Sequence, residues 1–335
     1  MAEWASEWVG LNIRVRVRVR VRVSSTCCLS ICVFQGALGR GFNGLPNFVM
    51  GVYDPAKETF TNISRAMLLD GGGGVNYGQL SWQGGPDGVS TVDDRVLFVS
   101  WLRLTEHTPP DCGTMGQLSA IRDLRYDPRL DRLVHAPIAE YAVLRDSSPL
   151  FQAKALKLVG GGQPVVLFNG GGSADKREGR AAAGRGSRSS VACGTPGGLG
   201  CGISMDAVFN VSVPAHAGAG AKAVISVRCN DVAACSGGAK ITLAVEAPDA
   251  TGARRVDMHV DYAYHITQTF TMLPGETVVP LRVLSDRRSL EIFAGPHGRA
   301  AISVTMLSAG GMVTAAAEGS DWELDATGWT LNSIH

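Results

Sequence analysis

Residues 281–293, with the sequence LRVLSDRRSLEIF, decide the fold of this chain. Val283 and Leu284 belong to an apolar run that ends at a charged break over residues 286–288, and Leu290 and Ile292 belong to a second apolar run. Two apolar runs around a short polar break predict a β-hairpin. The neighbouring stretches have the same character, so they are expected to add strands to one antiparallel sandwich.

The composition is that of a globular chain with room for one large core or two ordinary ones. Of its 335 residues, 45% are hydrophobic and 18% are charged, and 31 basic against 30 acidic residues give a net charge of +1. This balance offers no electrostatic attraction for nucleic acid or for an anionic membrane. No apolar run reaches the roughly 18 residues that a transmembrane helix needs. We therefore predict neither a nucleic-acid nor a membrane partner.

The eight cysteines do not indicate a metal centre, because none of them forms a CxxC pair. No metal and no cofactor is predicted. Cys193 and Cys201 flank a Gly-rich loop, and Cys229 and Cys235 flank a short turn. Each pair is compatible with a local disulfide in a secreted protein or with two unpaired thiols.

The first 47 residues are expected to be a low-complexity or irregular segment. Residues 13–23 alternate arginine with valine, which is typical of low complexity; the other interpretation is a basic strand that meets an anionic partner. Residues 1–10 lack the basic and apolar regions of a signal peptide, whereas sequons at Asn62 and Asn210 permit a secretory route. The localisation stays open.

Residues 48–146 read as short strands joined by turns, without helices between them, which indicates an all-β unit. The glycine run 71–74 is not interpreted as a phosphate loop, because no GK[ST] and no helix follow it. Pro137 is expected to make the last strand an edge or bent strand. The expected strands are 48–53, 59–64, 75–82, 95–104, 116–126 and 132–145.

Residues 147–335 are expected to form a β-sandwich with a Gly/Arg-rich insertion at 169–202. Two strand-like pieces precede the insertion, at 153–159 and 164–168. About ten strands follow it, at 208–213, 223–227, 240–245, 255–260, 270–273, 278–284, 289–293, 300–306, 313–316 and 322–331.

Several motifs, in order, resemble the closing part of the five-bladed propeller of glycoside hydrolase family 32, the invertases, inulinases and levanases. The segments are GVYDPAKETF, LDGGGGVNYGQLSW, DDRVLFVSWL and GQLSAIRDLRYDPRLDRLVHAPIAEYAVLR. The residues on matching positions are Asp70, Tyr77, Arg95, Trp101, Arg122, Asp123, Leu133, Pro137, Glu140, Leu144 and Arg145.

The C-terminal half is similar to the β-sandwich of the same family. The matching positions are Asp286, Ser289, Glu291, Phe293, Gly298, Trp329, Leu331 and Ile334. The resemblance implies an all-β fold in which a remnant of the last propeller blades, residues 48–146, precedes a C-terminal β-sandwich, residues 147–335.

The resemblance implies retaining hydrolysis of fructosyl bonds in sucrose- or fructan-type saccharides by two carboxyl groups. The family's Asn-Asp-Pro, Arg-Asp-Pro and Glu-Cys motifs do not occur at matching places in this sequence, so no catalytic residue is assigned. Asp286 and Glu291 are expected to be structural. Trp82 and Trp101 are expected to line what remains of the substrate-binding wall.

This chain is therefore expected to be a fragment of a fructosyl hydrolase. The fragment is expected to be inactive alone and to pair with a missing N-terminal propeller portion. It would be either a truncated gene model or half of a split enzyme. The alternative is a non-catalytic carbohydrate-binding or interaction β-sandwich. Its binding aromatics would be Tyr262, Tyr264 and Trp322, for which core packing is the preferred interpretation. The choice among sucrose, inulin and levan, and between hydrolysis and transfer, stays open.

Overall fold

The structure is a computed structural model. It describes residues 21–23, 27–32, 47–54, 56–57, 59–62, 67–72, 76–83, 95–103, 116–170, 203–218, 220–263, 265–286, 288–306 and 310–332, with some side chains before residue 104 excepted. Residues 171–202 of the expected insertion lie outside the described residues, and so does the possible disulfide between Cys193 and Cys201. Every described sheet is antiparallel, which confirms the all-β expectation.

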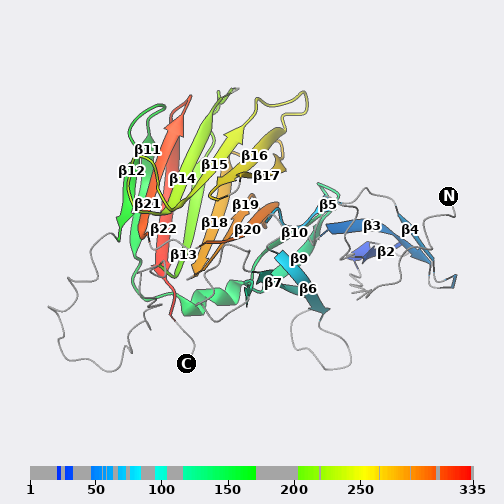
Figure 1. Ribbon diagram of the computed structural model, residues 1–335. Helices are drawn as coiled ribbons and strands as arrows, with labels where there is room; N and C mark the ends of the chain where they lie inside the picture. The colour runs from blue at the N-terminus through cyan, green and yellow to red at the C-terminus, as the bar shows by residue number, and fades with distance from the viewer. Residues whose placement is uncertain are drawn as a thin grey trace.

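Two six-stranded sheets form a sandwich in the C-terminal half (Figure 1). The first runs in the order β11 (Phe151–Leu158), β22 (Trp322–Thr330), β13 (Met205–Ser212), β18 (Val278–Asp286), β19 (Ser289–Ala294) and β20 (Ala300–Thr305). The second runs in the order β12 (Val165–Asn169), β21 (Met312–Glu318), β14 (Lys222–Cys229), β15 (Ala239–Val245), β16 (Arg254–Asp261) and β17 (His265–Met272).

One apolar core fills the space between these sheets, because their strands alternate inward apolar residues with outward polar ones. In β17, for example, Phe270 and Met272 are buried in this core, and Thr269 and Thr271 beside them are exposed. All ten strands expected after residue 206, and both strand-like pieces before the insertion, are present. Cys229 and Cys235 form a disulfide, which decides between the two alternatives that the sequence left open for this pair.

The hairpin at residues 281–293 is confirmed. Strands β18 and β19 pair through Asp286 and Ser289, which leaves a loop of two residues. All six residues of β19 are buried, whereas a strand with one face in water would alternate. One face of β19 packs into the sandwich core, and its other face is covered by a separate small sheet.

That small sheet has the order β10 (Arg132–Pro137), β9 (Arg122–Asp127), β7 (Val96–Arg103) and β6 (Asn76–Gln83), with β8 (Gly116–Leu118) also on β7. The expected strand 95–104 is the central β7, buried over its first five residues. Strand β10 lies at the sheet edge and ends at Pro137, as expected. Residues 138–145 correct the prediction: they leave the sheet, and Ala139–Leu144 form a 3₁₀ helix.

The expected strand 116–126 is also corrected, because it is divided into β8 and β9. Trp101 pairs with Leu118 and Phe98 pairs with Arg122, so three residues, 119–121, lie opposite two of β7. This is a β-bulge, which bends a strand and re-aims its side chains.

The N-terminal sheet holds β1 (Val21–Val23), β2 (Cys27–Cys32), β3 (Asn47–Asp54) and β4 (Thr59–Asn62), with β5 (Met67–Leu68) also on β3. The β3–β4 hairpin agrees with the sequence prediction. Strand β2 does not, since an irregular segment was expected there; its backbone pairs with both β1 and β3. Within the described residues, no helix is long and apolar enough to span a membrane.

Candidate functional site

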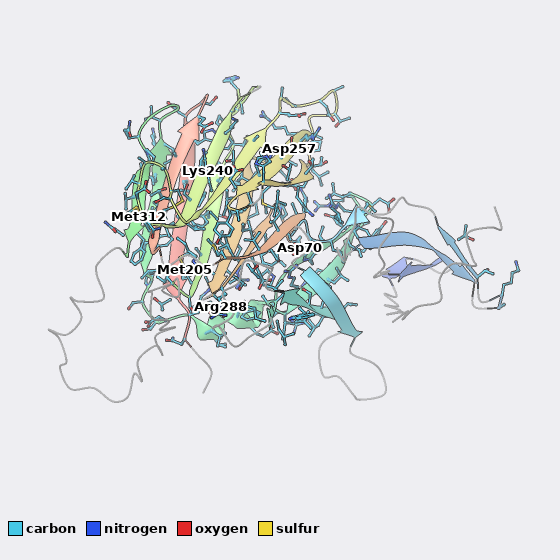
Figure 2. The ribbon with its side chains drawn as sticks, in the orientation of Figure 1. Asp70, Met205, Lys240, Asp257, Arg288 and Met312 are labelled. Atoms are coloured by element: carbon cyan, nitrogen blue, oxygen red, sulfur yellow. A yellow bond between two sulfur atoms is a disulfide. The ribbon has the colours of Figure 1, made fainter. Side chains whose placement is uncertain are left out.

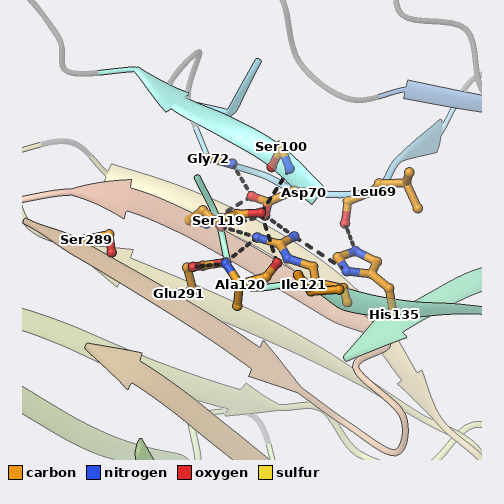
Figure 3. A network of polar contacts seen from close by, with 12 residues as sticks. Leu69, Asp70, Gly72, Ser100, Ser119, Ala120, Ile121, His135, Ser289 and Glu291 are labelled. Atoms are coloured by element: carbon orange, nitrogen blue, oxygen red, sulfur yellow. Dashed lines mark hydrogen bonds and ion pairs between the residues drawn. The ribbon is translucent and has the colours of Figure 1, made fainter. Parts of the chain in front are cut away.

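A buried polar network lies between the small sheet and the β19–β20 strands of the sandwich (Figure 3). It consists of Asp70, Arg122, His135, Glu291 and Ser303, called here the Arg122 network. Asp70 follows β5 at the border of the sandwich (Figure 2). Arg122 and His135 come from β9 and β10, and Glu291 and Ser303 come from β19 and β20. The side chains of five different segments thus meet in one buried place.

Arg122 binds both carboxylates. Its Nη1 donates to Asp70 Oδ2 at 2.7 Å, and its Nη2 donates to Glu291 Oε2 at 2.7 Å and to Ser303 Oγ at 2.7 Å. The guanidinium also lies 4.9 Å from the centre of the Phe293 ring, a cation–π distance. Because the Arg122 side chain is completely buried, its two Nη groups take these partners in place of water, as a buried charge requires. Its Nε has no hydrogen-bond partner among the described residues.

Asp70 is held by more donors than the guanidinium alone. Its Oδ1 accepts the backbone N–H groups of Gly72 and Ser303, both at 2.9 Å, and its Oδ2 accepts the Ser303 hydroxyl at 2.7 Å. Burial would raise the pKa of Asp70, but Arg122 and Ser303 outweigh it and hold this pKa below its usual 3.8. Asp70 is therefore a carboxylate in the folded chain.

Glu291 has fewer donors. Apart from Arg122, its Oε1 accepts the backbone N–H of Ala120 at 2.7 Å. Burial outweighs the attraction of Arg122, and the nearby charge of Asp70 adds to it, so the pKa of Glu291 is raised above 4.5. One guanidinium thus faces two buried carboxyl groups, and Glu291 is the one that more readily takes up a proton.

His135 lies beside this charge cluster as a neutral imidazole. Its Nε2–H donates to the Leu69 carbonyl at 2.6 Å, and its Nδ1 lies 3.5 Å from Arg122 Nη1. Burial and the charge of Arg122 lower the pKa of His135 to about 4. The ring makes edge contacts with Phe98 and Phe293 on the two sides of the junction.

The bulge in the small sheet is what gives Glu291 its backbone partner. The N–H of Ala120 turns to Glu291, and the N–H of Ile121 turns to the Tyr141 hydroxyl at 2.8 Å. Because both N–H groups donate to side chains instead of to a neighbouring strand, one continuous strand does not form here.

The glycine run has a packing role where it is described. Gly71 donates its N–H to the Ala301 carbonyl at 2.9 Å. A Cβ on Gly72 would lie 2.1 Å from the Ser303 carbonyl oxygen. These two glycines bring Asp70 against β20 by close backbone approach.

Two further arginines tie the same junction. Arg282 binds Asp206 at 2.8 Å and donates to the Pro137 carbonyl at 3.3 Å. Arg299 binds Glu276 at 2.5 Å and lies 3.9 Å from Asp127 at the end of β9. The small sheet and the sandwich are therefore joined by charged contacts at three places.

The predicted site residues are not part of this network. Trp82 lies in β6, where its backbone pairs with Leu97, and its side chain is outside the described structure. Trp101 pairs with Tyr77 and Leu118 and is half-buried. The two tryptophan positions lie on neighbouring strands, about 13 Å apart along the sheet.

The predicted structural carboxylates make structural contacts. Glu291 binds Arg122, and Asp286 accepts the Ser204 hydroxyl at 2.9 Å. Trp322 is in the sandwich core, 2% exposed, and Tyr262 packs half-buried against that core. Core packing is thus confirmed for Trp322, while Tyr264 lies outside the described residues.

His135 and Ser303 were missed by the sequence reasoning. The only signal for His135 was its place in the apolar run RLVHAP, and Ser303 had none. Among the residues that the structure describes, no group of three or more His, Cys, Asp or Glu side chains is placed to hold a metal ion.

Comparison with known proteins places the fold. No family model matches the sequence, and no curated protein matches it. Fructan 1-exohydrolase IIa from Cichorium intybus matches 91% of this chain and 57% of its own, with a TM-score of 0.66 and 13% identity. The β-fructofuranosidase of Schwanniomyces occidentalis matches 96% of this chain and 59% of its own, with a TM-score of 0.55 and 14% identity.

A third match names the family. The glycoside hydrolase family 32 β-fructofuranosidase of Bombyx mori matches 91% of this chain and 51% of its own, with a TM-score of 0.52 and 15% identity. The expected resemblance is therefore confirmed as a similarity of fold. This chain spans about half the length of the solved structures that it matches.

Proposed function

We propose that this chain supplies the closing blades and the C-terminal sandwich of a family 32 fructosyl hydrolase. In this proposal residues 48–146 form the partial propeller, residues 147–335 form the sandwich with its insertion at 169–202, and residues 1–47 are an N-terminal segment that contains strands β1 and β2. The observation that carries the proposal is the Arg122 network, because Asp70, Arg122 and Glu291 come from three separate motifs of the resemblance and both carboxyl groups bind Arg122.

The substrate class follows from the matched proteins. They include a fructan exohydrolase and two β-fructofuranosidases, one of them solved with sucrose. A fructose-containing saccharide bound by the whole enzyme is the proposed substrate, and Trp82 and Trp101 would line part of its pocket. An N-terminal propeller portion is the proposed partner.

Hydrolysis by this chain alone is not expected. A retaining glycosidase holds its two carboxyl groups about 5–5.5 Å apart on either side of the bond to be cleaved. Asp70 and Glu291 are both buried and both bound to Arg122, so a sugar cannot come between them. Both carboxyl groups instead form buried salt bridges with Arg122 at the junction between the small sheet and the sandwich.

An activity assay tests this proposal. The purified full chain is incubated with sucrose and with inulin, and released fructose is measured beside a sample that contains a known β-fructofuranosidase. We expect no release above the blank. Release by the full chain would overturn the proposed inactivity, and glycan binding without release would favour the carbohydrate-binding alternative.

A second test addresses the partner. The genome is searched, first immediately upstream of this gene and then throughout, for an open frame with Asn-Asp-Pro, Arg-Asp-Pro and Glu-Cys motifs. We expect such a frame in this genome, either contiguous or as a separate gene. Its absence throughout the genome would contradict the split or truncated origin.

A further inference from the structure

The sequon Asn210-Val211-Ser212 lies in β13, a strand inside the first sheet of the sandwich. Side chains alternate along a strand, and here the alternation is clear: Phe209 and Val211 are completely buried, while Asn210 is exposed. The acceptor amide of the sequon therefore projects away from the core into solvent.

No described residue covers the surface around Asn210. Its direct neighbours across the sheet are Pro280 on β18 and Asp325 on β22. Asp325 is exposed, and Val278, two positions from Pro280, is 37% exposed. A bulky group on Asn210 would meet solvent at this part of the face.

The other end of the same face is covered. Asp206, four positions before Asn210 and about 13 Å away along the strand, is buried beneath Arg145 and Arg282. Arg282 in turn contacts Pro137 of the small sheet. The junction with the small sheet thus occupies one end of the face and leaves the Asn210 end clear.

A second, independent observation concerns the compartment. Cys229 and Cys235 are joined in a disulfide, on the other sheet of the same sandwich. Disulfides of this kind persist in oxidising compartments and are rare in the cytosol. The same secretory route is where sequons are glycosylated.

We propose that Asn210 is an N-glycosylation site of this protein. In the transfer, Nδ2 of Asn210 forms a bond to C1 of the first sugar of a lipid-pyrophosphate-linked oligosaccharide. The bond from C1 to the pyrophosphate oxygen breaks, the lipid pyrophosphate leaves, and Nδ2 loses one proton. No oxidation or reduction takes place.

The fold sets the order of events. In the folded chain the backbone of β13 is paired on both sides, with β18 and with β22, over its whole length. The sequon is therefore locked in the sheet once the sandwich forms, and transfer has to precede that step. The attached glycan then covers the open part of the β13–β18–β22 face without touching the sandwich core or the junction.

The test uses the full chain secreted from eukaryotic cells through an added leader. The purified protein is treated with peptide N-glycosidase in ¹⁸O-water, which converts a glycosylated Asn to a labelled Asp, and the peptide that contains residue 210 is analysed by mass spectrometry. We expect the label at Asn210, and we expect the Cys229–Cys235 peptides to be disulfide-linked in the same material.

Matched variants separate the site from its surroundings. Asn210→Gln and Ser212→Ala should each lose the glycan, Ser212→Thr should keep it, and Asn62→Gln should leave the label at residue 210 unchanged. If a variant fails to be secreted, the spectrum of the unaltered chain still decides. An unlabelled Asn210 in secreted chain with the disulfide formed would overturn the proposal. This inference is independent of the proposed enzyme family.

Discussion

Arg122 and Glu291 are 169 positions apart in the chain, and their side chains form a 2.7 Å salt bridge in a fully buried place. Arg122 belongs to the small sheet, and Glu291 belongs to the hairpin strand that the sheet covers. Asp70 binds the same guanidinium from a third segment. Because a buried charge without its partner is costly, this contact couples the folding of the two β units.

Replacing Arg122 with methionine should destabilise the whole chain strongly. Two buried carboxyl groups would lose their shared cation, which typically costs about 3–5 kcal/mol. Urea unfolding of the full chain measures the effect. Arg125→Met is the matched control on the same strand. Arg125 forms an ion pair with Asp123, and the Arg125 side chain is 56% exposed. Exposed ion pairs contribute below about 1 kcal/mol to the free energy of unfolding. Equal losses in the two variants would contradict the role assigned to Arg122.

Glu291→Gln should reduce the loss of stability that occurs as the pH rises above 4.5 and through the raised pKa of Glu291. The folded-state pKa of Glu291 is raised above 4.5, so its contribution to stability is complete below that value and is lost as pH rises through the folded pKa. Glutamine cannot ionise, so the free energy of unfolding should fall less over this rise. A pH series of urea unfolding curves measures it.

Asp70→Asn should change the pH dependence of stability in the opposite direction, and the same pH series measures it. The pKa of Asp70 is lowered below 3.8, so its contribution is present above the usual pKa and is lost as pH falls through the folded value. The variant should be less stable than the unaltered chain at neutral pH, and the difference should shrink in acid. If the free energy of unfolding depended on pH in the same way in both variants, the opposite pKa shifts assigned to Asp70 and Glu291 would be wrong.

His135→Gln should weaken the acid dependence of stability. The unfolded histidine takes up a proton near 6.5, whereas the folded one resists protonation until about 4, so stability is lost as pH falls between these values. A glutamine amide can still donate to the Leu69 carbonyl but does not titrate there. Unfolding at pH 7 and pH 4.5 should differ less in the variant; an unchanged difference would exclude His135 as the cause.

Gly298→Ala should destabilise the contact between the sandwich and the small sheet. Gly298 has φ +71°, and a Cβ there would lie 2.0 Å from the His135 carbonyl oxygen. Gly275 has φ +85° with nothing within 4 Å of the added atom, so Gly275→Ala carries only the backbone cost of about 1–2 kcal/mol. Thermal unfolding should show a larger loss for Gly298→Ala, and similar midpoints would argue against the clash.

Local patterns in the sequence predicted most of the strands. The hairpin of β18 and β19 and the central strand β7 follow from apolar runs and the turns between them, which act over a few residues. The division of residues 116–127 was not predictable in this way. It depends on Glu291, more than 160 positions later, which takes the backbone N–H of Ala120.

The sequence alone also marked Asp70, Arg122 and Glu291, through three separate motifs of one resemblance, but it assigned them no common place. Only the tertiary structure decided that Asp70 and Glu291 both bind Arg122, and only it brought in His135 and Ser303. The physical reason is range: strand formation is set by neighbours along the chain, whereas a buried charge takes its partner from whichever segments the packing of two sheets brings together.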